Sequence, residues 1–436
     1  MLKHRLARRA LIVAPLRVAH STWPREIKKW DQFRHLRAGV VQGKDKAKIL
    51  RDVENFDVQI TTPETLEWLL SQFKGKRLPW DVLFVDESSR FKSPKSERWK
   101  LLKRHSKKFT RRYILTGSPA PDSLLDLYTQ IFLLDFGASL GQRYTHYRDR
   151  YFNSCGYMGY DWQVKHGAED SIHRAIAPLV LTMRAEDYLE LPPLVINDVF
   201  VDLPDDAREL YDRMERDLFA MLGDNIELLA ESNASAHNKC HQIANGAIFE
   251  DIPELDRLAG RKPRNRKWHV VHNAKVEAFE SIAYEMGGRP LLTAYHYTHE
   301  VERLQAFIKK EFKRDAPYIG GGVNVKTSDR LCDEWNRAVH PFLLAHPASV
   351  SHGLNMQETN GGACFYSLTY NYDHYDQFIR RLWRQGARHG VSVHRIIARD
   401  TLDEAIASAL VVKHGTQRGV FDAVKKYRRE KYRRLF

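Results

Sequence analysis

Cysteine is scarce in this chain, with four residues among 436, no CxxC pair and no neighbouring histidine at zinc spacing. A disulfide framework or a structural zinc site needs cysteines at closer spacing, so we expect reduced thiols in a cytosolic-type compartment. Long apolar runs are also missing, since no stretch reaches the roughly 18–20 residues that span a bilayer. The cysteines are Cys155, Cys240, Cys332 and Cys364.

The first residues imitate a short signal peptide, with basic residues ahead of the apolar run 10–14. Pro15 and Arg17 break that run at once. A signal peptide carries a longer apolar core than these five residues. We therefore expect residues 10–14 to form a buried strand.

Positive charge exceeds negative charge, giving a formal net charge of +14. Lys and Arg side chains that neutralise phosphates release counterions, so this excess favours a nucleic-acid partner. A soluble basic protein without such a partner has the same composition, and the charge alone leaves both interpretations open. The balance of 43% hydrophobic and 28% charged residues is that of an ordinary globular protein, here long enough for two or three domains.

Short apolar runs alternate with longer helix-period segments, which predicts an α/β fold with parallel sheets. Polar or small residues follow the runs of the N-terminal half, at the sheet edge where open α/β folds bind ligands. A second α/β unit begins near Lys275. The expected strands are 10–14, 58–60, 82–85, 112–115, 290–294, 342–345, 364–367 and 392–398, and the expected helices are 205–235, 274–286, 298–312 and 401–413.

Changes in composition suggest the domain boundaries. Residues 136–190 are aromatic, basic and poorly periodic, and Leu191-Pro192-Pro193 then stops any helix. A basic linker with Gly and Pro follows at 257–267, and 411–436 carry nine Lys or Arg against two acids. We expect a first lobe with an aromatic and basic extension at 1–190, a helical insertion and basic linker at 191–270, a second lobe at 271–412 and a basic C-terminal helix at 413–436.

Two strand ends of the first lobe carry candidate chemistry. Asp86-Glu87 directly follows an apolar strand, where one carboxylate can hold Mg²⁺ and the next can orient or deprotonate a water molecule. Thr116-Gly117 end the next strand, where a hydroxyl and a small residue can sense that arrangement. Solvated turns would place the same residues there, so either pair alone is weak evidence for a catalytic site.

A third candidate lies in the second lobe, where Gln377, Arg381 and Arg384 are spaced i, i+4 and i+7. On a helix these three side chains share one face. Guanidinium groups suit the negative charge that grows on a phosphoryl group during its transfer. A solvated basic helix face explains the arginines, but not their convergence with Gly353 near a strand edge of the same lobe.

Taken in order, these segments resemble the Swi/Snf-like branch of helicase superfamily two, in particular its compact phage and bacterial members. Each motif alone is weak evidence for this family, but seven motifs in the same order are a specific signal. Together they cover nearly the whole chain. Ser88-Ser89 depart from the DEAH pattern of motif II. Residues 10–30 are similar to motif Ia, 60–64 to motif Ib, 86–89 to motif II, 115–119 with 126–128 to motif III, 291–295 to motif IV, 351–355 to motif V and 377–386 to motif VI.

The resemblance implies two RecA-like lobes with helical insertions, ATP and Mg²⁺ as cofactors, and double-stranded DNA as the track, in the cytoplasm or the host cytoplasm for a phage protein. It implies that Asp86 holds the metal, that Glu87, also beside the metal, is the catalytic base, and that Arg381 and Arg384 are arginine fingers supported by Gln377. The other implied nucleotide contacts are Thr116, Gly117 and Gly353, and the implied nucleic-acid contacts are Pro15, Trp23, Thr61, Thr62, Ser351 and His352.

One element of this family is missing from the sequence, because no Gly-x-x-x-x-Gly-Lys-[Ser/Thr] occurs in it. That loop supplies the amide cradle and the lysine for the nucleotide phosphates. Its strand is expected to lie centrally in the first sheet and to leave an unpaired edge there. Three explanations stay open: a fragment whose loop lies on another polypeptide, a degenerate member that binds DNA without hydrolysis, or an unrecognised route to phosphate.

Two functional hypotheses follow. The first is an ATP-driven motor that translocates on duplex DNA rather than separating its strands. The second is a DNA-binding module that does not hydrolyse ATP. A nuclease is disfavoured, since no cluster of acids with a lysine at nuclease spacing stands out.

Overall fold

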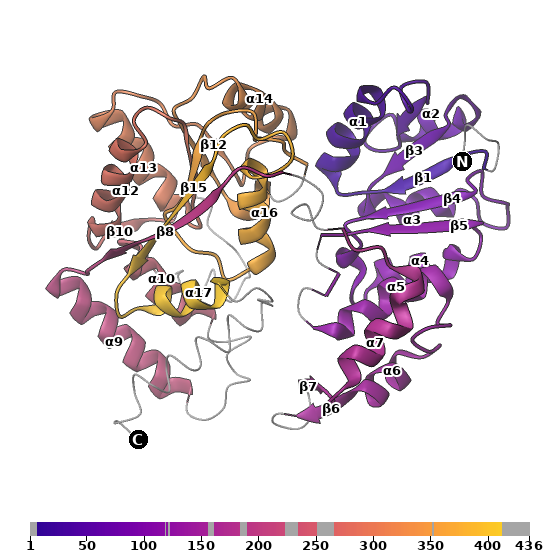
Figure 1. Cartoon of the computed structure of the whole chain (residues 1–436), viewed down its shortest axis with the longest axis horizontal. Coiled ribbons are helices and arrows are strands. Elements are labelled where there is room, and N and C mark those ends of the chain that lie inside the picture. The colour runs from indigo at the N-terminus through magenta and orange to yellow at the C-terminus, as the bar shows by residue number, and fades with distance from the viewer. Residues whose placement is uncertain are drawn as a thin grey trace. The chain divides into compact units, whose positions relative to one another are not determined.

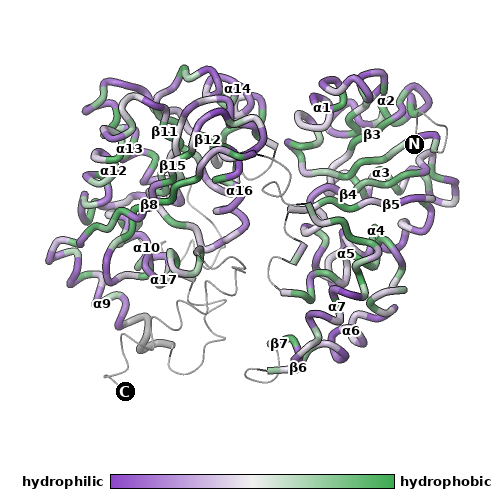
Figure 2. The backbone as a smooth tube through the Cα atoms, in the orientation of Figure 1, coloured by the Kyte–Doolittle hydropathy of each residue, from purple (hydrophilic) through white to green (hydrophobic). Residues whose placement is uncertain are grey.

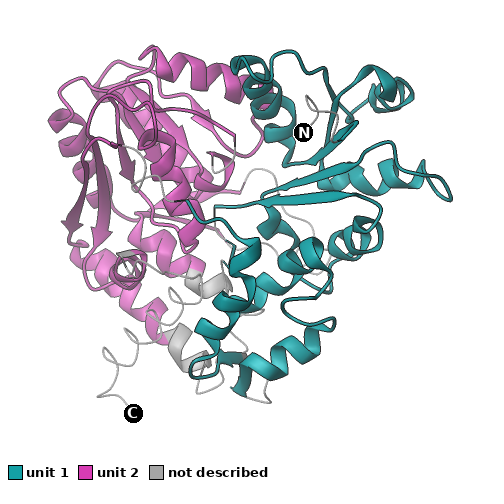
Figure 3. Ribbon diagram, turned by 45° about the vertical axis from the view of Figure 1, so that its right-hand side comes forward, with its two compact units in different colours: residues 1–183 teal, residues 184–436 magenta. Residues whose placement is uncertain are grey.

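The computed structural model describes residues 7–117, 119–120, 123–155, 161–183, 190–222, 234–250, 266–350 and 353–411. The chain divides into two compact units, residues 1–183 and 184–436 (Figure 3). Each unit contains a parallel sheet that helices cover (Figure 1). The expected α/β class is therefore confirmed.

The sheet of the first unit has five parallel strands in the order β2-β3-β1-β4-β5. Its central strand β1 is buried along its whole length, as its unbroken apolar run predicts for a strand covered on both faces. Figure 2 shows the apolar residues of this unit concentrated on its central strands. The strands are β1 (Ala10–Val13), β2 (Ala38–Val40), β3 (Val58–Thr61), β4 (Val82–Asp86) and β5 (Arg111–Leu115).

Successive side chains of β1 point to opposite faces of the sheet and enter different cores. Leu11 and Val13 pack into the core that contains α3, α4 and α5. Ala10 and Ile12 pack into a smaller core that contains Ile27 of α1. The helices of the unit are α1 (Trp23–Lys29), α2 (Lys46–Arg51), α3 (Pro63–Ser71), α4 (Glu97–Ser106), α5 (Leu127–Asp135), α6 (Tyr144–Tyr151) and α7 (Ala168–Ile176), with the shorter turns η1 (Val18–Thr22), η2 (Val53–Asn55), η3 (Ser88–Phe91), η4 (Leu124–Asp126) and η6 (Ala177–Leu179).

The strand order corrects one expectation. The centre of the first sheet has no gap, because β1 pairs directly with β3 and β4, and β4 pairs with β5. The outer strands are β2 and β5. A further parallel strand can therefore join this sheet only at one of those two edges.

The aromatic segment after residue 136 extends the main core of the first unit. Tyr147 is fully buried and packs against Tyr128, Tyr151 and Phe152, with ring centroids 5.4–5.6 Å apart. The segment also contains the hairpin β6 (Phe152–Cys155) and β7 (Asp161–Val164). Much of the aromatic content that stood out in the sequence is thus packing between α5, α6 and this hairpin.

The second unit contains a six-stranded parallel sheet in the order β12-β13-β11-β14-β15-β8. Its outer strand β8 pairs with β15 over eight residues and lies within the segment expected to be a helical insertion. The prolines at 192 and 193 stop a helix, but they do not prevent a strand from starting after them. The strands are β8 (Leu194–Val201), β11 (Leu291–Ala294), β12 (Tyr318–Ile319), β13 (Phe342–Ala345), β14 (Gly362–Phe365) and β15 (Val391–Ala398), with a separate antiparallel pair β9 (Ala247–Phe249) and β10 (Trp268–Val270).

Helices pack on both faces of the second sheet. α12 and α13 share one core with Leu291 and Leu344, whereas α14, α16 and α17 share another with Leu292 and Leu343. The expected helix 205–235 is described as α9 up to Leu222, and residues 223–233 lie outside the described residues. The expected linker lies mostly outside them, and the C-terminal helix 413–436 entirely so. The helices are α9 (Asp205–Leu222), α10 (Ala234–Ala244), α12 (Ala274–Glu285), α13 (Thr298–Glu311), α14 (Val325–Asn336), α15 (Pro347–Val350), α16 (Tyr372–Leu382) and α17 (Leu402–Val411).

A buried polar network joins α10 to the second sheet. The Lys275 ammonium lies 2.6 Å from Asp403 Oδ2 and donates a hydrogen bond to Asn245 Oδ1, also at 2.6 Å. The Asn245 amide donates to Ser367 Oγ at 2.8 Å, and the Asn245 carbonyl accepts from the Tyr366 hydroxyl at 3.0 Å. All five side chains are essentially fully buried, so their mutual hydrogen bonds replace the lost contacts with water.

Candidate functional site

The carboxylate of Asp86 stands at the end of β4 and is held through both of its oxygens. The indole N–H of Trp23 donates to Oδ2 at 2.8 Å, and the backbone N–H of Glu87 donates to Oδ1 at 3.0 Å. A carboxylate oxygen can accept more than one hydrogen bond, so the group has the chemistry to accept from metal-bound water as well. Glu87 adopts a left-handed backbone conformation with φ 51°, which turns the chain sharply into η3. Such strain in a non-glycine residue is often found at functional sites.

Motifs II and III are tied together inside the first unit by a residue that the sequence analysis did not single out. The Ser88 hydroxyl donates to Gln130 Oε1 at 2.7 Å, and the Gln130 amide nitrogen donates to the carbonyls of Pro119 and Asp126. Ser88 and Gln130 are both buried. The serine that departs from the family pattern is therefore one end of an internal bridge.

Thr116 and Gly117 follow β5 at the same edge of the sheet as Asp86, because Asp86 and Leu115 are paired neighbours of parallel strands. Thr116 is half-buried and Gly117 is exposed. A Cβ atom added at Gly117 would meet no atom within 4 Å. The structure thus brings the expected residues of motifs II and III to one edge and leaves open space beside them.

The expected nucleic-acid contacts of motifs Ia and Ib are mostly buried. Pro15, Thr61 and Thr62 are all covered by the first unit. The Thr61 hydroxyl donates to the Val41 carbonyl at 3.2 Å, and the Thr62 hydroxyl donates to Thr65 Oγ1 at 3.3 Å. These side chains are used to shape the strand ends, which counts against direct contacts from them to a phosphate.

Motifs V and VI meet within the second unit, as their convergence at Gly353 predicted. Arg381 Nη1 donates to the Leu354 carbonyl at 2.9 Å, and Arg384 Nη1 donates to Asn355 Oδ1 at 2.6 Å. Gly353 has a φ of 76°, a conformation that favours glycine. Ser351 and His352, the expected nucleic-acid contacts of motif V, lie outside the described residues.

Gln377, Arg381 and Arg384 do not all lie on one helix, which corrects the expectation that the three side chains share one helix face. Helix α16 contains Gln377 and Arg381 but ends at Leu382, and Arg384 follows in a turn. The helix ends there because the Trp383 indole donates to the Pro192 carbonyl at 2.7 Å, while Arg384 bonds to Asn355. Within the described part of the chain, Gln377 Oε1 is buried without a hydrogen-bond partner.

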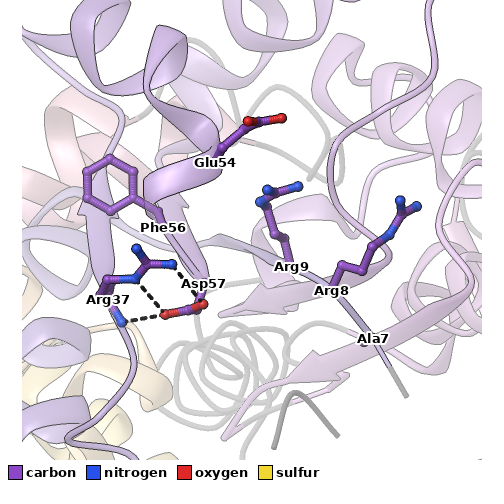
Figure 4. Close-up of a pocket in the computed structure, with 7 residues that line it drawn as sticks. All are labelled: Ala7, Arg8, Arg9, Arg37, Glu54, Phe56 and Asp57. Carbon is purple, nitrogen blue, oxygen red and sulfur yellow. Dashed lines mark hydrogen bonds and ion pairs between the residues drawn. The ribbon is translucent and has the colours of Figure 1, made fainter. Parts of the chain in front are cut away.

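A separate depression of about 330 Å³ lies at the amino ends of the first sheet's strands, opposite the edge that carries Asp86 (Figure 4). Two of its arginines are already paired, Arg37 with Asp57 and Arg8 with Asp81. Burial raises the pKa of Asp57, but the hydrogen bonds and charge of Arg37 outweigh this and lower it. With its charges largely compensated, the depression is a weaker candidate than the Asp86 edge. Its lining residues are Ala7, Arg8, Arg9, Arg37, Glu54, Phe56 and Asp57.

Other kinds of site receive little support from the described residues. Among them, no group of three or more His, Cys, Asp or Glu side chains is arranged to hold a metal ion. None of the described helices is both long and apolar enough to cross a membrane. None of the four cysteines, all of which lie among the described residues, forms a disulfide, and three of them are buried.

Comparison with known proteins gives a consistent assignment. Residues 2–251 match the family model described as SNF2-related domain, which is more than half of the chain. The phage protein p41 of Acyrthosiphon pisum secondary endosymbiont phage 1 is 34% identical over 434 residues, covering 95% of this chain and 88% of the phage protein. The Bacillus subtilis ATP-dependent helicase/translocase YwqA is 22% identical over 411 residues.

Apart from the phage protein, the curated relatives are longer proteins. This chain spans 18% of the Arabidopsis thaliana protein CHROMATIN REMODELING 4 and 41% of YwqA. A solved Sulfolobus solfataricus SWI2/SNF2 ATPase core in complex with dsDNA covers 99% of this chain at 21% identity and a TM-score of 0.40. The family match and the phage relative, rather than this structural likeness, determine the assignment.

Proposed function

We propose, because the chain belongs to the SNF2-related domain family, that it is a DNA-dependent ATPase of Swi/Snf type that moves on duplex DNA. The observation that carries the proposal is the assembly of two half-sites, each within its own unit. One joins Asp86, Glu87 and Trp23, and the other joins Arg381, Arg384 and Asn355. The names of relatives such as the helicase/translocase YwqA agree with this class of activity.

The residues of the first half-site fit a magnesium ion. The Asp86 carboxylate is oriented by Trp23, and its oxygens can each accept more than one hydrogen bond, as contact with metal-bound water requires. The adjacent Glu87 is half-buried, and its carboxylate would act as base toward the attacking water. When bound, ATP–Mg²⁺ supplies the phosphoryl group and a metal ion that neutralises its charge. In the second half-site, Arg381 and Arg384 are held by the loop that follows Gly353 and offer guanidinium groups to a phosphoryl oxygen.

The sequence does not fit the remaining part of a nucleotide site. No Gly-x-x-x-x-Gly-Lys-[Ser/Thr] loop occurs in it, so its residues offer no such cradle of amides for the α- and β-phosphates and no such lysine for the β- and γ-phosphates. The test therefore includes a peptide that supplies this loop.

The experiment measures phosphate release from ATP with and without duplex DNA, for the full chain alone and with that peptide. We expect DNA to stimulate release when the peptide is bound. Glu87→Gln and Arg384→Ala should each lower the stimulated rate by about 10²-fold or more, because they remove the base and a positive charge used in the transition state. If DNA does not stimulate phosphate release while the peptide is shown to be bound, the proposal is wrong.

Two substitutions serve as matched controls. Glu67→Gln and Arg388→Ala make the same chemical changes at exposed positions outside both half-sites. They should leave the DNA-stimulated rate unchanged. A comparable loss in these variants would show that the effect of the test variants comes from the overall charge rather than from the half-sites.

A DNA-binding module without hydrolysis is the second candidate function, favoured by the missing loop together with the net charge of +14. It predicts salt-sensitive duplex binding, because bound phosphates release counterions, and no dependence on nucleotide. Binding is measured by fluorescence anisotropy across a salt series. A change in duplex affinity on adding a non-hydrolysable ATP analogue would contradict this alternative.

A further inference from the structure

The segment from Arg98 to Arg112 concentrates positive charge on the surface of the first unit. It contains eight Lys or Arg and no Asp or Glu. Helix α4 forms most of it and packs beside α5 through the buried side chains of Trp99 and Leu102 (Figure 1). Exposed cations occupy the helix, the turn after it and the start of β5, and we call them the α4 cation row. The row consists of Lys100, Lys103, Arg104, Lys107, Lys108 and Arg111.

The spacing within the row brings its charges together. Lys100, Arg104 and Lys107 are spaced i, i+4 and i+7, which places them on one side of a helix. Like charges at this spacing repel each other and weaken the helix slightly. From Lys100 to Lys107 the row extends about 10 Å, which corresponds to about three phosphates along one strand of a duplex.

Few acids offset this charge. Glu97 pairs with Lys100 at 2.7 Å. Within the described residues, no ion pair joins any other member of the row to a carboxylate. The helix dipole supplies about half of a negative elementary charge at the C-terminus of α4, which is far less than the charge of the row. The row therefore presents a net positive surface to solvent.

Aromatic rings hold part of this charge in place. The Lys103 ammonium lies 4.7 Å from the centre of the Phe132 ring, and the Lys107 ammonium lies 5.3 Å from that of Phe136. The Arg112 guanidinium lies over the same Phe136 ring at 4.6 Å, and the hydrogen bonds it forms within the described residues all go to backbone carbonyls. Side chains held in this way lose less conformational entropy when they bind an anion.

The row lies away from the edge that carries Asp86. Arg111 pairs with Val82 at the start of β4, whereas Leu115 pairs with Asp86 at its end. A strand rises about 3.3 Å per residue, so Arg111 is about 13 Å from Leu115 along β5. A ligand of the row is therefore bound separately from a ligand at Asp86.

The chemistry of the row favours a phosphate backbone. The apolar residues of the segment pack into the core, and Trp99, Leu102 and Phe109 are buried. A protein partner usually needs aromatic or aliphatic anchors in the interface, and a membrane-surface helix needs an exposed apolar face. Phosphates need only cations, and contacts to them carry no base sequence.

We infer that the α4 cation row binds the phosphate backbone of a nucleic-acid duplex, as a contact separate from the Asp86 edge and independent of base sequence and of nucleotide. This goes beyond the proposed function, which assigns no contact to α4. The inference rests on the uncompensated charge, on the rings that hold it and on the lack of exposed apolar anchors.

The first test measures acetylation of lysine amines by mass spectrometry, on the full chain with and without a saturating mixed-sequence DNA duplex, and without nucleotide. Bound phosphates should protect Lys103, Lys107 and Lys108. Lys310 and Lys313, which are exposed on the second unit, are the controls and should react equally in both samples. Protection of neither set, or equal protection of both, would overturn the inference.

A charge variant tests the same contact independently. Arg104→Gln, Lys107→Gln and Lys108→Gln, combined in one chain, remove three cations of the row. The logarithm of the binding constant falls with the logarithm of the salt concentration by about 0.9 for each phosphate neutralised, so this slope should become shallower by about two to three. Fluorescence anisotropy across a salt series measures it, and a slope equal to that of the unaltered chain contradicts the inference.

The matched control combines Lys310→Gln, Lys313→Gln and Arg314→Gln, which removes the same three charges from an exposed surface of the second unit. Glu311 and Asp315 lie between and beside these cations in the sequence. The slope should stay as in the unaltered chain. An equal change in both variants would show an effect of net charge alone, and the inference would be wrong.

A competitor separates a duplex from an acidic protein as the partner of the row. A duplex carries a negative charge about every 1.7 Å, whereas an extended polyglutamate chain carries one about every 3.3–3.6 Å. Polyglutamate at the same charge concentration should therefore protect the row less than the duplex does. Stronger protection by polyglutamate would identify an acidic protein as the partner instead.

Neither the acetylation nor the anisotropy measurement uses ATP, so the two proposals fail separately. Protection of the row without any DNA-stimulated phosphate release would leave this contact intact and refute the ATPase. Stimulated release without protection of the row would refute this contact alone.

Discussion

Trp23 shows how one side chain can serve a different partner from the one its motif suggests. The sequence resemblance assigns it to nucleic acid, but its indole N–H donates to Asp86 Oδ2 at 2.8 Å. We expect Trp23→Phe to weaken Mg²⁺-dependent nucleotide binding about tenfold, the effect of losing a hydrogen bond to a charged group. Duplex affinity without nucleotide should stay the same, as measured by anisotropy.

Trp30→Phe is the control for this prediction, because the Trp30 indole likewise donates to a carboxylate, Glu26 Oε2, at 2.8 Å on the surface. It should change neither quantity. If Trp23→Phe instead lowers only the duplex affinity, the assignment from the sequence is correct and the contact with Asp86 is incidental.

Gln130 bridges Ser88 and Pro119 from a buried position. Gln130→Met keeps its approximate size but leaves the Ser88 hydroxyl and two backbone carbonyls without this partner. We expect it to lower the free energy of unfolding by about 2–3 kcal/mol, measured by urea denaturation. In the double variant Ser88→Ala, Gln130→Met, the loss should be smaller than the sum of the single losses, and strict additivity would show that the bridge contributes nothing.

Neither contact could be predicted from the sequence. Trp23 and Asp86 are 63 residues apart, and Ser88 and Gln130 are 42 apart. Local patterns mark which residues end a strand, and so Asp86 and Thr116 were placed at one edge correctly. They do not reveal which side chain from another segment will form a hydrogen bond with those residues.

At the scale of elements, the strands with unbroken apolar runs were predicted within one or two residues. β4 and β13 are examples, because a strand buried on both faces has few polar positions. β8 was missed, since Asn197 and Asp198 interrupt its apolar pattern and its partner β15 lies far along the chain. The end of α16 was misplaced for a similar reason, because Trp383 bonds to a carbonyl 191 residues away.

The ion pair of Lys275 and Asp403 fastens α12 to α17 inside the second unit. Lys275→Met leaves the buried Asp403 carboxylate without its cation, which should cost about 3–5 kcal/mol in the free energy of unfolding. Lys309→Met removes a lysine from an exposed pair with Asp315, whose N–O separation of 2.7 Å is close to the 2.6 Å of the buried pair, and it should leave stability unchanged. Urea denaturation measures both.

Removing the second charge refines this prediction. In the double variant Lys275→Met, Asp403→Asn no charge stays buried, so part of the lost stability should return. If the double variant is no more stable than Lys275→Met alone, the loss comes from packing around the lysine stem rather than from an uncompensated charge.

For the molecule as a whole, buried histidines make stability depend on pH. Burial lowers the pKa of His272 and of His296 to about 4, and that of His299 to about 3. Below the ordinary value near 6.5 the unfolded chain binds these protons and the folded unit does not, so stability is complete above pH 6.5 and falls as the pH drops toward 4. The expected slope is on the order of 1 kcal/mol per pH unit for each histidine.

The measurement is urea denaturation between pH 6.5 and 5.5. Burial raises the pKa of Glu300, which contributes a slope of opposite sign, so the histidine contribution is read from the difference between the unaltered chain and a histidine variant. His299→Phe removes one titrating group and should flatten the slope. An unchanged slope in this variant would show that His299 binds its proton equally in the folded unit and in the unfolded chain.

The pairing of β8 with β15 also determines when the second unit can be completed during synthesis. β8 is the first strand of that unit, and the partner contact from Arg395 to Asp198 spans 197 residues. At about 5–20 residues per second, a ribosome needs about 10–40 s to make the chain between them. During that time Leu194, Val199 and Val201 have no core to pack against, so the nascent chain must be protected from aggregation for longer than a unit built from local hairpins.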